Sequence, residues 1–556
     1  MRKELERQME TRQEKRFTLE RLIDKSEERT YLEVPFEIGE GYERVEVRLS
    51  VTGSDDGGGP CVVDLGLRSP ERIVGWSGGA RDRVFVSAEK ATPGYLPRPV
   101  APGTWAVLLG AYRVPEAGCL AKLEVTLAPP VPRWLKGDLH THSVHSDGTY
   151  TIAGALDSCR SLGLDFIALT DHNTASQNAA ARVPDEKLLV IPGVELTSYM
   201  GHVNLLGQPD ALDDFRVLNG ADAADGLSKA RERGAFVSLN HPFCPDCPWL
   251  LGFDVPFDAI EVWNGPWRGL NETAVRWWQE QLASGHRIIA LGGSDTHRPN
   301  SVVRHGGPTA FVRSETDTVS GIMDGIRAGR VVLSYAPDGT FASMDSRGSG
   351  SGDIALPDED GAVPLTIEVS GAAGDVLALW SDRGIEAQWR LEGPADREAE
   401  WAEAARKLAG FAGGRELRAL ADTQAAATAA PAGCRSAAEA AAEDISAANA
   451  LAGGRNAAAG TEAYGPAAGE TAAAESAADR TAAATSSAAL MARPGTGFGC
   501  LPEPLLVQTG PGGSARLIFA GSADRLFYRL EARRFVPDTD VSVMTCLTNP
   551  IFIKNR

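Results

Sequence analysis

The sequence predicts an α/β protein in which a central domain of alternating strands and helices lies between two β-rich domains. Three observations lead to this fold class. Apolar residues alternate with a period of two before residue 133, strand-like and helix-like runs alternate over 134–335, and short strand-like runs return after that. A length of 556 residues corresponds to about three or four domains. With 43% hydrophobic and 23% charged residues the chain can bury a core, which excludes a wholly disordered protein.

The N-terminal part predicts a helix followed by a β-sandwich. Residues 1–30 are densely charged, with many acid–base pairs three or four positions apart, which favours a surface helix. Over 31–133 the candidate strands are separated by turn-rich stretches such as GSDDGGGP, and they lie at 45–51, 61–67, 83–88, 104–112 and 122–128. Short strands without long helices are typical of a β-sandwich, which we expect to be a structural or dimerising module.

The central domain, residues 134–335, combines both periodicities. Strand-like runs such as DFIALT and RIIALGG alternate with helix-like stretches such as 151–163 and 273–285. This alternation indicates βα units and a mainly parallel sheet. Seven or eight strands fit a compact α/β barrel better than a pair of dinucleotide-binding halves. No GxGxxG follows a strand and no GxxxxGK[ST] occurs, so a nucleotide cradle lacks support.

The C-terminal part predicts a small β-domain interrupted by an insertion. Short strand-like runs such as VPLTIEVSG and ARLIFAG occur over 336–395 and 499–556. Between them, residues 396–498 are Ala-rich and hold few bulky β-forming side chains, so this segment cannot build a core of its own. We expect the insertion to be disordered or loosely helical.

Charge and targeting signals restrict the partners. Asp and Glu total 74 against 55 Lys and Arg, giving a net charge of −19, and such a surface repels long polyanions. The first thirty residues contain no apolar signal-peptide core, and nowhere do 18 apolar residues run together. Eight Cys spread along the chain do not suggest a disulfide framework. We therefore expect a cytoplasmic protein that binds a small molecule and no membrane, whether monomeric or a homo-oligomer.

Nine candidate metal ligands recur at strand ends of the central domain. His140 and His142 form an HxH motif whose imidazoles share one face, because residues two apart on a strand point the same way. Asp295 and His297 form a second such pair in SDTH. The other candidates are Asp147 in SDG, His172 in TDHN, Glu195 in GVE, His202, and His241 in NHP. Carboxyl ends of parallel strands meet at one edge of a sheet, so we expect these side chains to converge.

This donor set predicts a metal-dependent hydrolase. Imidazoles combined with carboxylates suit Zn²⁺, Mn²⁺ or Fe²⁺ better than Ca²⁺ or Mg²⁺. Nine ligands correspond to two to three ions per chain, if an open catalytic site takes three protein ligands and one carboxylate is shared. Such ions lower the pKa of bound water to about 7, which makes hydroxide available for hydrolysis.

The motif order also resembles a known family. HTH, SDG, TDHN, GVE, NHP and SDTH in this order resemble the PHP superfamily (polymerase and histidinol phosphatase domain), whose members are metal-dependent hydrolases and mostly phosphoesterases. Flanking phrases such as EVWNGPW and LTNPIFI resemble its CehA/McbA branch, named for a carbaryl hydrolase. The resemblance implies a distorted (β/α)7 barrel over 134–335, with a trinuclear centre at its C-terminal rim.

Individual roles follow from the resemblance alone. It implies that His140, His142, Glu195 and Asp295 hold one ion, that Glu195 bridges to a second ion bound by His202 and His241, and that Asp147, His172 and His297 hold the third. It also makes Glu195, Asp295 and His202 the residues expected to act in catalysis. No ligand of the motif set is missing, which argues against an inactive scaffold.

Three functions are compatible with the sequence. The first is hydrolysis of a small phosphoester, such as a nucleotide, a sugar phosphate or the end of a short oligonucleotide. The second is hydrolysis of a carbamate or carboxyl ester, and the third is a non-catalytic binding module stabilised by metal. Asn264, Trp267 and Arg298 are the candidate substrate contacts, because they lie next to these strand ends.

Two further features of the sequence each allow two interpretations. His145, in HSVHSDG, either orients a ligand or belongs to a surface loop. Cys244 and Cys247 form a CxxC directly after His241, and a lone CxxC is either a pair of incidental thiols or a redox or metal element.

Overall fold

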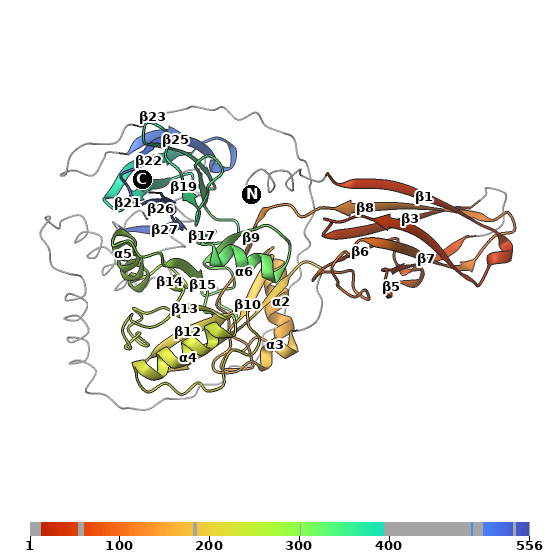
Figure 1. Ribbon diagram of the computed structural model, residues 1–556, viewed down its shortest axis with the longest axis horizontal. Coiled ribbons are helices and arrows are strands. Elements are labelled where there is room, and N and C mark those ends of the chain that lie inside the picture. Colours follow the sequence, from red (N-terminus) through yellow and green to blue (C-terminus); the bar gives the residue numbers. More distant parts are fainter. Residues whose placement is uncertain are drawn as a thin grey trace, which may run out of the picture.

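The computed structural model describes residues 13–53, 60–181, 186–300, 302–393, 491–492, 504–536 and 541–554. An N-terminal β-sandwich extends away from a larger body that contains the central and C-terminal strands (Figure 1). The predicted insertion at 396–498 lies outside the described residues, except for β23 (Met491–Ala492), which pairs in parallel with β25 (Ala515–Ser522). At these two residues the structure therefore has a strand where an irregular insertion was expected.

The sandwich consists of two four-stranded sheets. One has the order β1 (Lys15–Ile23), β8 (Cys119–Ala128), β3 (Arg44–Gly53), β6 (Arg83–Ser87), and the other β2 (Tyr31–Ile38), β7 (Gly103–Arg113), β4 (Val62–Arg68), β5 (Ile73–Trp76). Alternate side chains meet between the sheets in a core that includes Val45, Leu65, Trp105 and Leu123. A disulfide between Cys61 and Cys119 links the two sheets, a pairing that the Cys spacing did not indicate.

The helix expected over residues 1–30 is wrong where the structure describes this segment. Lys15–Ile23 form β1, which pairs along its whole length with β8, and a short 3-10 turn, η1 (Lys25–Glu27), follows. The side chains of Phe17, Leu19 and Ile23 fall on the inner face because they are two or four residues apart. Pairing with a neighbouring strand therefore outweighs the helix propensity of the charged residues between them.

The central domain is a mixed sheet. Its strands are β9 (Arg133–Asp138), β10 (Phe166–Leu169), β11 (Leu189–Ser198), β12 (Gly201–Leu206), β13 (Phe236–Asn240), β14 (Ala259–Asn264) and β15 (Ile289–Gly293), hydrogen-bonded in this order. Most neighbours are parallel, but β12 runs antiparallel to both β11 and β13. The expected mainly parallel sheet is confirmed for most neighbours, whereas β11 and β12 are joined by a tight turn rather than by a helix. The distorted (β/α)7 barrel stays a prediction.

Few helices accompany this sheet. The described ones are α2 (Ile152–Ser161), α3 (Ser176–Ala180), α4 (Gly220–Glu232), α5 (Gly269–Ala283) and α6 (Val319–Arg327). Thr151 and Thr318 cap α2 and α6 through their side-chain oxygens, as N-cap residues do. The first and last strands approach each other just beyond their ends, where Thr141 forms an isolated parallel bridge with Thr296. The two ends of the sheet therefore meet at the edge where the candidate ligands lie.

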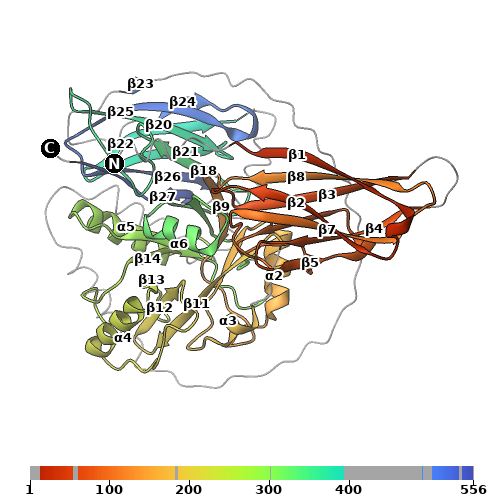
Figure 2. The ribbon, with the colours of Figure 1, turned by 45° about the vertical axis from the view of Figure 1, so that its right-hand side comes forward.

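The C-terminal strands continue the central sheet. β9 pairs with β16 (Thr309–Ser314), which pairs with β17 (Val331–Ser334) and then β27 (Val541–Thr548), β26 (Phe527–Val536), β21 (Asp375–Ser381), β22 (Gly384–Glu392) and β24 (Leu505–Gln508). A second sheet contains β18 (Phe341–Asp345), β20 (Ala362–Ser370), β25 and β23, and the pair β19 (Ile354–Ala355) and β28 (Ile551–Ile553) joins at β26. Figure 2 shows these strands above the central domain.

Polar contacts join the sandwich to the central domain. Lys90 Nζ lies 2.8 Å from Asp317 Oδ1, and the Glu89 carboxylate accepts a hydrogen bond from the backbone N–H of Val319 at the start of α6. Lys90 is buried, so this ion pair is partly shielded from water. Among the described residues no helix is long and apolar enough to cross a membrane.

Candidate metal centre

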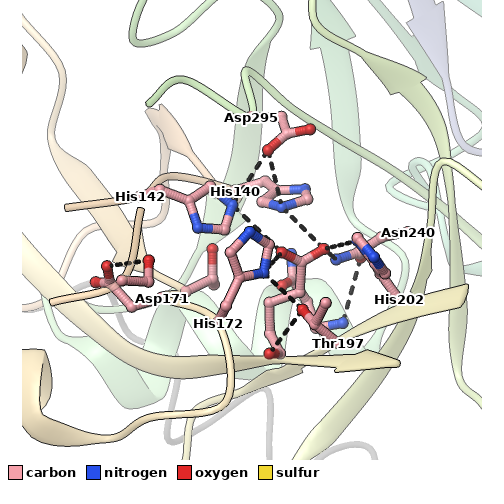
Figure 3. A network of polar contacts seen from close by, with 12 residues as sticks. His140, His142, Asp171, His172, Thr197, His202, Asn240 and Asp295 are labelled. Atoms are coloured by element: carbon pink, nitrogen blue, oxygen red, sulfur yellow. Dashed lines mark hydrogen bonds and ion pairs between the residues drawn. The ribbon is translucent and has the colours of Figure 1, made fainter. Parts of the chain in front are cut away.

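Nine ligand side chains meet at one edge of the central sheet. His140 and His142 follow β9, His172 follows β10, His241 follows β13, and Asp295 and His297 follow β15; Asp147 lies in the loop after His142, Glu195 lies within β11 and His202 near the start of β12. Because β12 runs antiparallel to β11, its beginning lies at the same edge as the ends of its neighbours. Figure 3 shows the labelled members of this group pointing toward one another.

Glu195 is at the centre of the cluster. Its Oε1 lies 3.3 Å from His140 Nε2, 3.2 Å from His202 Nδ1 and 3.6 Å from His241 Nε2. Its Oε2 lies 3.3 Å from His142 Nε2. The carboxylate is completely buried, so both oxygens face imidazoles rather than water.

Asp295 and Asp147 extend the cluster on the other side. Asp295 Oδ1 lies 3.1 Å from His142 Nε2 and 3.4 Å from His140 Nε2. Asp147 Oδ1 lies 3.3 Å from His297 Nε2 and 3.5 Å from His172 Nε2. Five overlapping groups have donor atoms within 4.8 Å of one another, the distance over which ligands can share one ion: His142/Asp147/His172/His297, His140/His142/Asp295, His140/Glu195/His241, His172/Glu195/His202 and His202/His241/Cys247.

Several buried nitrogen and oxygen atoms that could bind a metal ion have no hydrogen-bond partner among the described residues. They are His140 Nε2 and both ring nitrogens of His142. Glu195 Oε2 forms no hydrogen bond of good geometry either, although His172 Nδ1 lies 2.8 Å from it. An unsatisfied buried polar atom costs about 1–3 kcal/mol, and more when it is charged. These atoms point at one another rather than into apolar surroundings, so the residues present fit divalent cations that take up their lone pairs.

The charges of the cluster are strongly coupled. Burial favours the neutral forms, but attraction outweighs it: the imidazole of His140 keeps the pKa of Glu195 well below its usual range and also lowers the pKa of Asp295. Against the same effect of burial, Asp295 and Glu195 raise the pKa of His140 well above its usual value, and Glu195 raises the pKa of His241 to about 9. Without metal, the carboxylates are thus neutralised by protons held on the imidazoles.

A surrounding set of polar residues fixes the ligands, and the sequence analysis did not identify most of it. Glu261 Oε1 lies 3.0 Å from His140 Nδ1, and its Oε2 accepts a hydrogen bond from the backbone N–H of His241. Asn240 donates to Glu195 Oε1 at 2.8 Å. Glu261 lies on β14 and Asn240 on β13 with side chains toward the ligands, so strand parity next to a known ligand was the available signal.

Two buried aspartates hold the ligand loops. Asp138, the last residue of β9, accepts hydrogen bonds from the backbone N–H groups of His140, Ser294 and Gly306. Asp171 accepts from the backbone N–H and hydroxyl of Ser143 and from the Ser146 hydroxyl, which fixes the loop that leads to Asp147.

The backbone at the site is unusual. Asp295 and His241 adopt positive φ values of 53° and 28°, which few non-glycine residues do outside sites where the surroundings impose them. Gly293 immediately precedes this turn, and a Cβ there would lie 2.4 Å from His140 Cβ. Only glycine lets the end of β15 approach His140 this closely.

The three predicted substrate contacts differ from one another in position and exposure. Asn264 lies at the site: its side-chain amide donates to Glu261 Oε2 and Asp295 Oδ2, each at 3.2 Å. Trp267 is only 4% exposed and packs in the core against Trp263, so the structure gives it a packing role instead of an open face for substrate. Arg298 is exposed beyond the SDTH turn.

The remaining histidines are His145, His286 and His305. His145 contacts the Ser176 hydroxyl through Nδ1 at 2.7 Å and forms part of the adjoining loop. His305 is buried, contacts Ser158 and packs against Tyr150, whereas His286 is exposed. His286 and His305 belong to none of the candidate ligand groups among the described residues.

Comparisons with known proteins give partial matches. No known protein-family profile matches the chain. A curated protein, the phosphoribosyl 1,2-cyclic phosphate 1,2-diphosphodiesterase of Eggerthella lenta, is 38% identical over 64 residues, which are 11% of this chain and 24% of the relative. The match thus spans about a quarter of that relative's length.

Solved structures with similar chains include two described as phosphoesterases. A Bacteroides vulgatus two-domain protein containing a predicted PHP-like metal-dependent phosphoesterase has a TM-score of 0.32 and 22% identity, covering 46% of this chain and 80% of its own. A Bifidobacterium adolescentis protein described as a putative metal-dependent phosphoesterase has a TM-score of 0.23 and 18% identity, with 34% and 95% covered. A Chromobacterium violaceum amidohydrolase with bound sulfate and no metal has a TM-score of 0.21 and 18% identity, with 30% and 90% covered.

Proposed function

We propose that this protein is a metal-dependent phosphoesterase of the PHP type that hydrolyses a small phosphoester. The observation that carries the proposal is the cluster of nine His, Asp and Glu side chains, of which His140, His142, Glu195 and His241 are buried. Inner metal-donor atoms of this cluster lack hydrogen-bond partners among the described residues. A structural ion-pair network would satisfy these atoms, whereas a metal centre leaves them free for cations.

The cluster is suited to two to three divalent ions, Mn²⁺, Zn²⁺ or Fe²⁺. His140, His142 and Asp295 would hold one, Glu195 would be shared with the one held by His202 and His241, and Asp147, His172 and His297 would hold the third. Bound divalent ions supply an activated water near neutral pH and stabilise negative charge on the phosphoryl oxygens.

The chain's own residues prepare this chemistry. Glu195 and Asp295, with their lowered pKa values, stay ionised at neutral pH and bring negative charge to the centre of the cluster. Glu261 and Asn240 hold His140 and Glu195 in place, so that their donor atoms need little rearrangement on binding cations. Asn264 sits beside Asp295, and the hydrogen bonds that its amide donates to Glu261 and Asp295 hold these carboxylates in place.

A phosphate also needs a cation from the protein. Arg268 donates to Asn264 Oδ1 at 3.0 Å, and Asn264 in turn bonds Asp295, so a guanidinium lies beside the cluster. Arg268 Nε is buried without a partner among the described residues, which leaves a donor for phosphate. We propose Arg268, with Arg298 farther out, as the phosphate-binding side chains.

Substrate class is also part of the proposal. A nucleotide, a sugar phosphate or the end of a short oligonucleotide fits a small site on a protein of net charge −19. The name of the partial Eggerthella lenta relative describes a cyclic phosphodiester of a phosphoribosyl group, which belongs to the same substrate class. Hydrolysis of a carbamate or carboxyl ester would be favoured by a neutral aromatic pocket. Trp263 and Trp267 are both buried and do not line such a pocket, which makes this second function the weaker candidate.

Hydrolysis assays on the Mn²⁺-loaded protein test this proposal. The panel contains bis(p-nitrophenyl) phosphate, p-nitrophenyl phosphate, p-nitrophenyl acetate and a naphthyl methylcarbamate, each with Glu195→Gln as the matched inactive control. We expect phosphoester turnover that disappears with chelator and in the variant. Faster turnover of the acetate or carbamate, or no metal-dependent turnover of any substrate, would contradict it.

A further inference from the structure

Four of the six imidazoles of the cluster share one arrangement of their two nitrogens, those of His140, His172, His241 and His297. In His202 it is Nδ1 that faces Glu195, and both nitrogens of His142 lack a hydrogen-bond partner among the described residues. In His140, Nδ1 contacts Glu261 Oε1 at 3.0 Å while Nε2 faces Glu195 and Asp295. In His297, Nδ1 contacts the Asp295 carbonyl at 2.9 Å while Nε2 faces Asp147. A fixed acceptor at Nδ1 holds the proton there and leaves the Nε2 lone pair for a metal ion.

His172 and His241 follow the same arrangement. His172 Nδ1 contacts the Thr197 hydroxyl at 2.6 Å and also lies 2.8 Å from Glu195 Oε2, and its Nε2 faces Asp147. His241 Nε2 faces Glu195 Oε1 at 3.6 Å, and its Nδ1 lies 3.6 Å from Cys247 Sγ. Where His140, His172 and His297 have an oxygen acceptor at Nδ1, His241 therefore has a sulfur.

The loop that carries Cys247 is anchored beside the metal ligands. The backbone N–H of Cys244 donates to the His241 carbonyl at 2.8 Å, and that of Trp249 donates to the Pro242 carbonyl at 2.9 Å. The Trp249 side chain is buried against Gly201, where a Cβ would lie 2.5 Å from the indole. Cys247 is thus placed between the turn before His202 and the imidazole of His241.

We propose that Cys247 is a positioning residue for the metal centre: its sulfur accepts the Nδ1–H of His241 and directs the Nε2 of that ring to the ion shared with Glu195. This inference rests on the proposed metal site and assigns a role to one member of the CxxC pair. An alternative is direct ligation, because donor atoms of His202, His241 and Cys247 lie within 4.8 Å of one another.

Binding of Co²⁺ to the full chain tests the positioning role without relying on turnover. We expect Cys247→Ala to weaken the binding of one Co²⁺ by about 10–100-fold, the usual loss when a partner of a ligating histidine is removed. Cys247→Ser should restore most of the affinity, because a hydroxyl serves His172 in the same way. His145→Ala is the control: its side chain belongs to none of the candidate ligand groups, and the variant should bind Co²⁺ as the wild type does.

The absorption spectrum of bound Co²⁺ and the Co²⁺ affinities of the variants separate the possible outcomes. A sulfur-to-cobalt charge-transfer band in the wild type that is lost in Cys247→Ser would overturn the positioning role in favour of ligation. Equal Co²⁺ affinity in wild type and Cys247→Ala, with circular dichroism showing both folded, would overturn it in favour of plain packing. If Co²⁺ affinity depends on Cys247 but no phosphoester is hydrolysed, the positioning role stands and the proposed function fails.

Discussion

Two clusters of charged side chains in this molecule differ in whether their buried polar atoms have hydrogen-bond partners. In the C-terminal region, Arg529 and Arg533 meet Glu531 and Glu272: Arg529 Nη1 contacts Glu531 at 2.7 Å, and both terminal nitrogens of Arg533 contact Glu272 at 3.0 Å. None of these four side chains has a buried atom without a partner. At the metal centre, buried nitrogens and oxygens of His140, His142 and Glu195 have none among the described residues.

The difference separates a structural network from a candidate binding site. Arginine brings fixed positive charge and several donors, so the carboxylates beside it are satisfied within the protein. Histidine gives up its proton easily and then offers only a lone pair, so a carboxylate among histidines is satisfied by protons or by metal ions. The innermost side chains of the two clusters are buried alike, and we therefore expect the same substitution to have different consequences because the partners of the carboxylates differ.

The largest expected effect is that of Glu195→Gln. An amide cannot share a negative charge between two ions, so we expect loss of bound metal and a fall in kcat/KM well beyond the ~10–100-fold typical of an outer partner, with the fold retained. Elemental analysis, hydrolysis assays and circular dichroism measure these effects. Near-normal turnover with full metal occupancy would refute the shared role of Glu195.

The matched change in the other cluster is Glu531→Gln. It leaves the buried guanidinium of Arg529 without its counter-charge, and we expect a loss of about 3–5 kcal/mol in the free energy of unfolding. Activity per folded molecule should stay unchanged. Urea unfolding followed by circular dichroism gives the first quantity, and a turnover assay at low temperature gives the second; a specific loss of turnover without loss of stability would break the comparison.

Glu261→Gln should give an intermediate effect. The amide keeps the shape of the side chain but accepts less strongly from His140 Nδ1–H and from the His241 backbone. We expect a loss of about 10–100-fold in metal affinity with little change in stability. Calorimetric titration with Zn²⁺ checks this, and an affinity equal to that of the wild type would show that Glu261 does not position the ligands.

Metal affinity should rise with pH. In the metal-free protein the pKa of His241 is raised to about 9 and that of His140 well above its usual value, so both rings are protonated at neutral pH and must lose protons to bind metal. Raising the pH toward about 9 removes this competition. Titrations with Co²⁺ from about pH 6 to about pH 9 should show tighter binding and proton release; an affinity independent of pH would contradict the assignment.

His145→Ala should have the smallest effect. The imidazole of His145 contacts Ser176 on the adjoining loop and belongs to none of the candidate ligand groups. We expect a change within about 0.5 kcal/mol in stability and turnover close to that of the wild type. Parallel assays with Glu195→Gln on the same protein preparation measure the contrast, and a loss as large as that of Glu195→Gln would place His145 in the metal centre.

Much of the site could be predicted from the sequence because its signal is local. An HxH motif or an SDTH motif places two donors on one face within three or four residues, and the strand before each motif indicates which edge of the sheet it faces. The sandwich strands were visible for the same reason, since alternation with a period of two is a property of each segment alone. Membership in the CehA/McbA branch and a cytoplasmic location stay predictions.

Other features depend on contacts between distant segments. Residues 15–23 have helix-forming composition, and only the neighbouring strand β8 makes them a strand. The reversed direction of β12, which brings His202 to the ligand edge, follows from a tight turn at Gly201 rather than from the pattern of the strand. Trp267 was expected to face substrate, and core packing buries it instead.

The sequence by itself determined which residues are the candidate metal ligands, because imidazole and carboxylate donors recur in short motifs whose chemistry does not depend on the rest of the chain. Only the tertiary structure decided how those donors are oriented. Glu261 and Asn240 reach His140 and Glu195 from other strands, at distances in sequence that no local pattern records. Hydrogen-bond geometry is set by where backbones pack, so the protons and lone pairs of the centre became assignable once those backbones were placed.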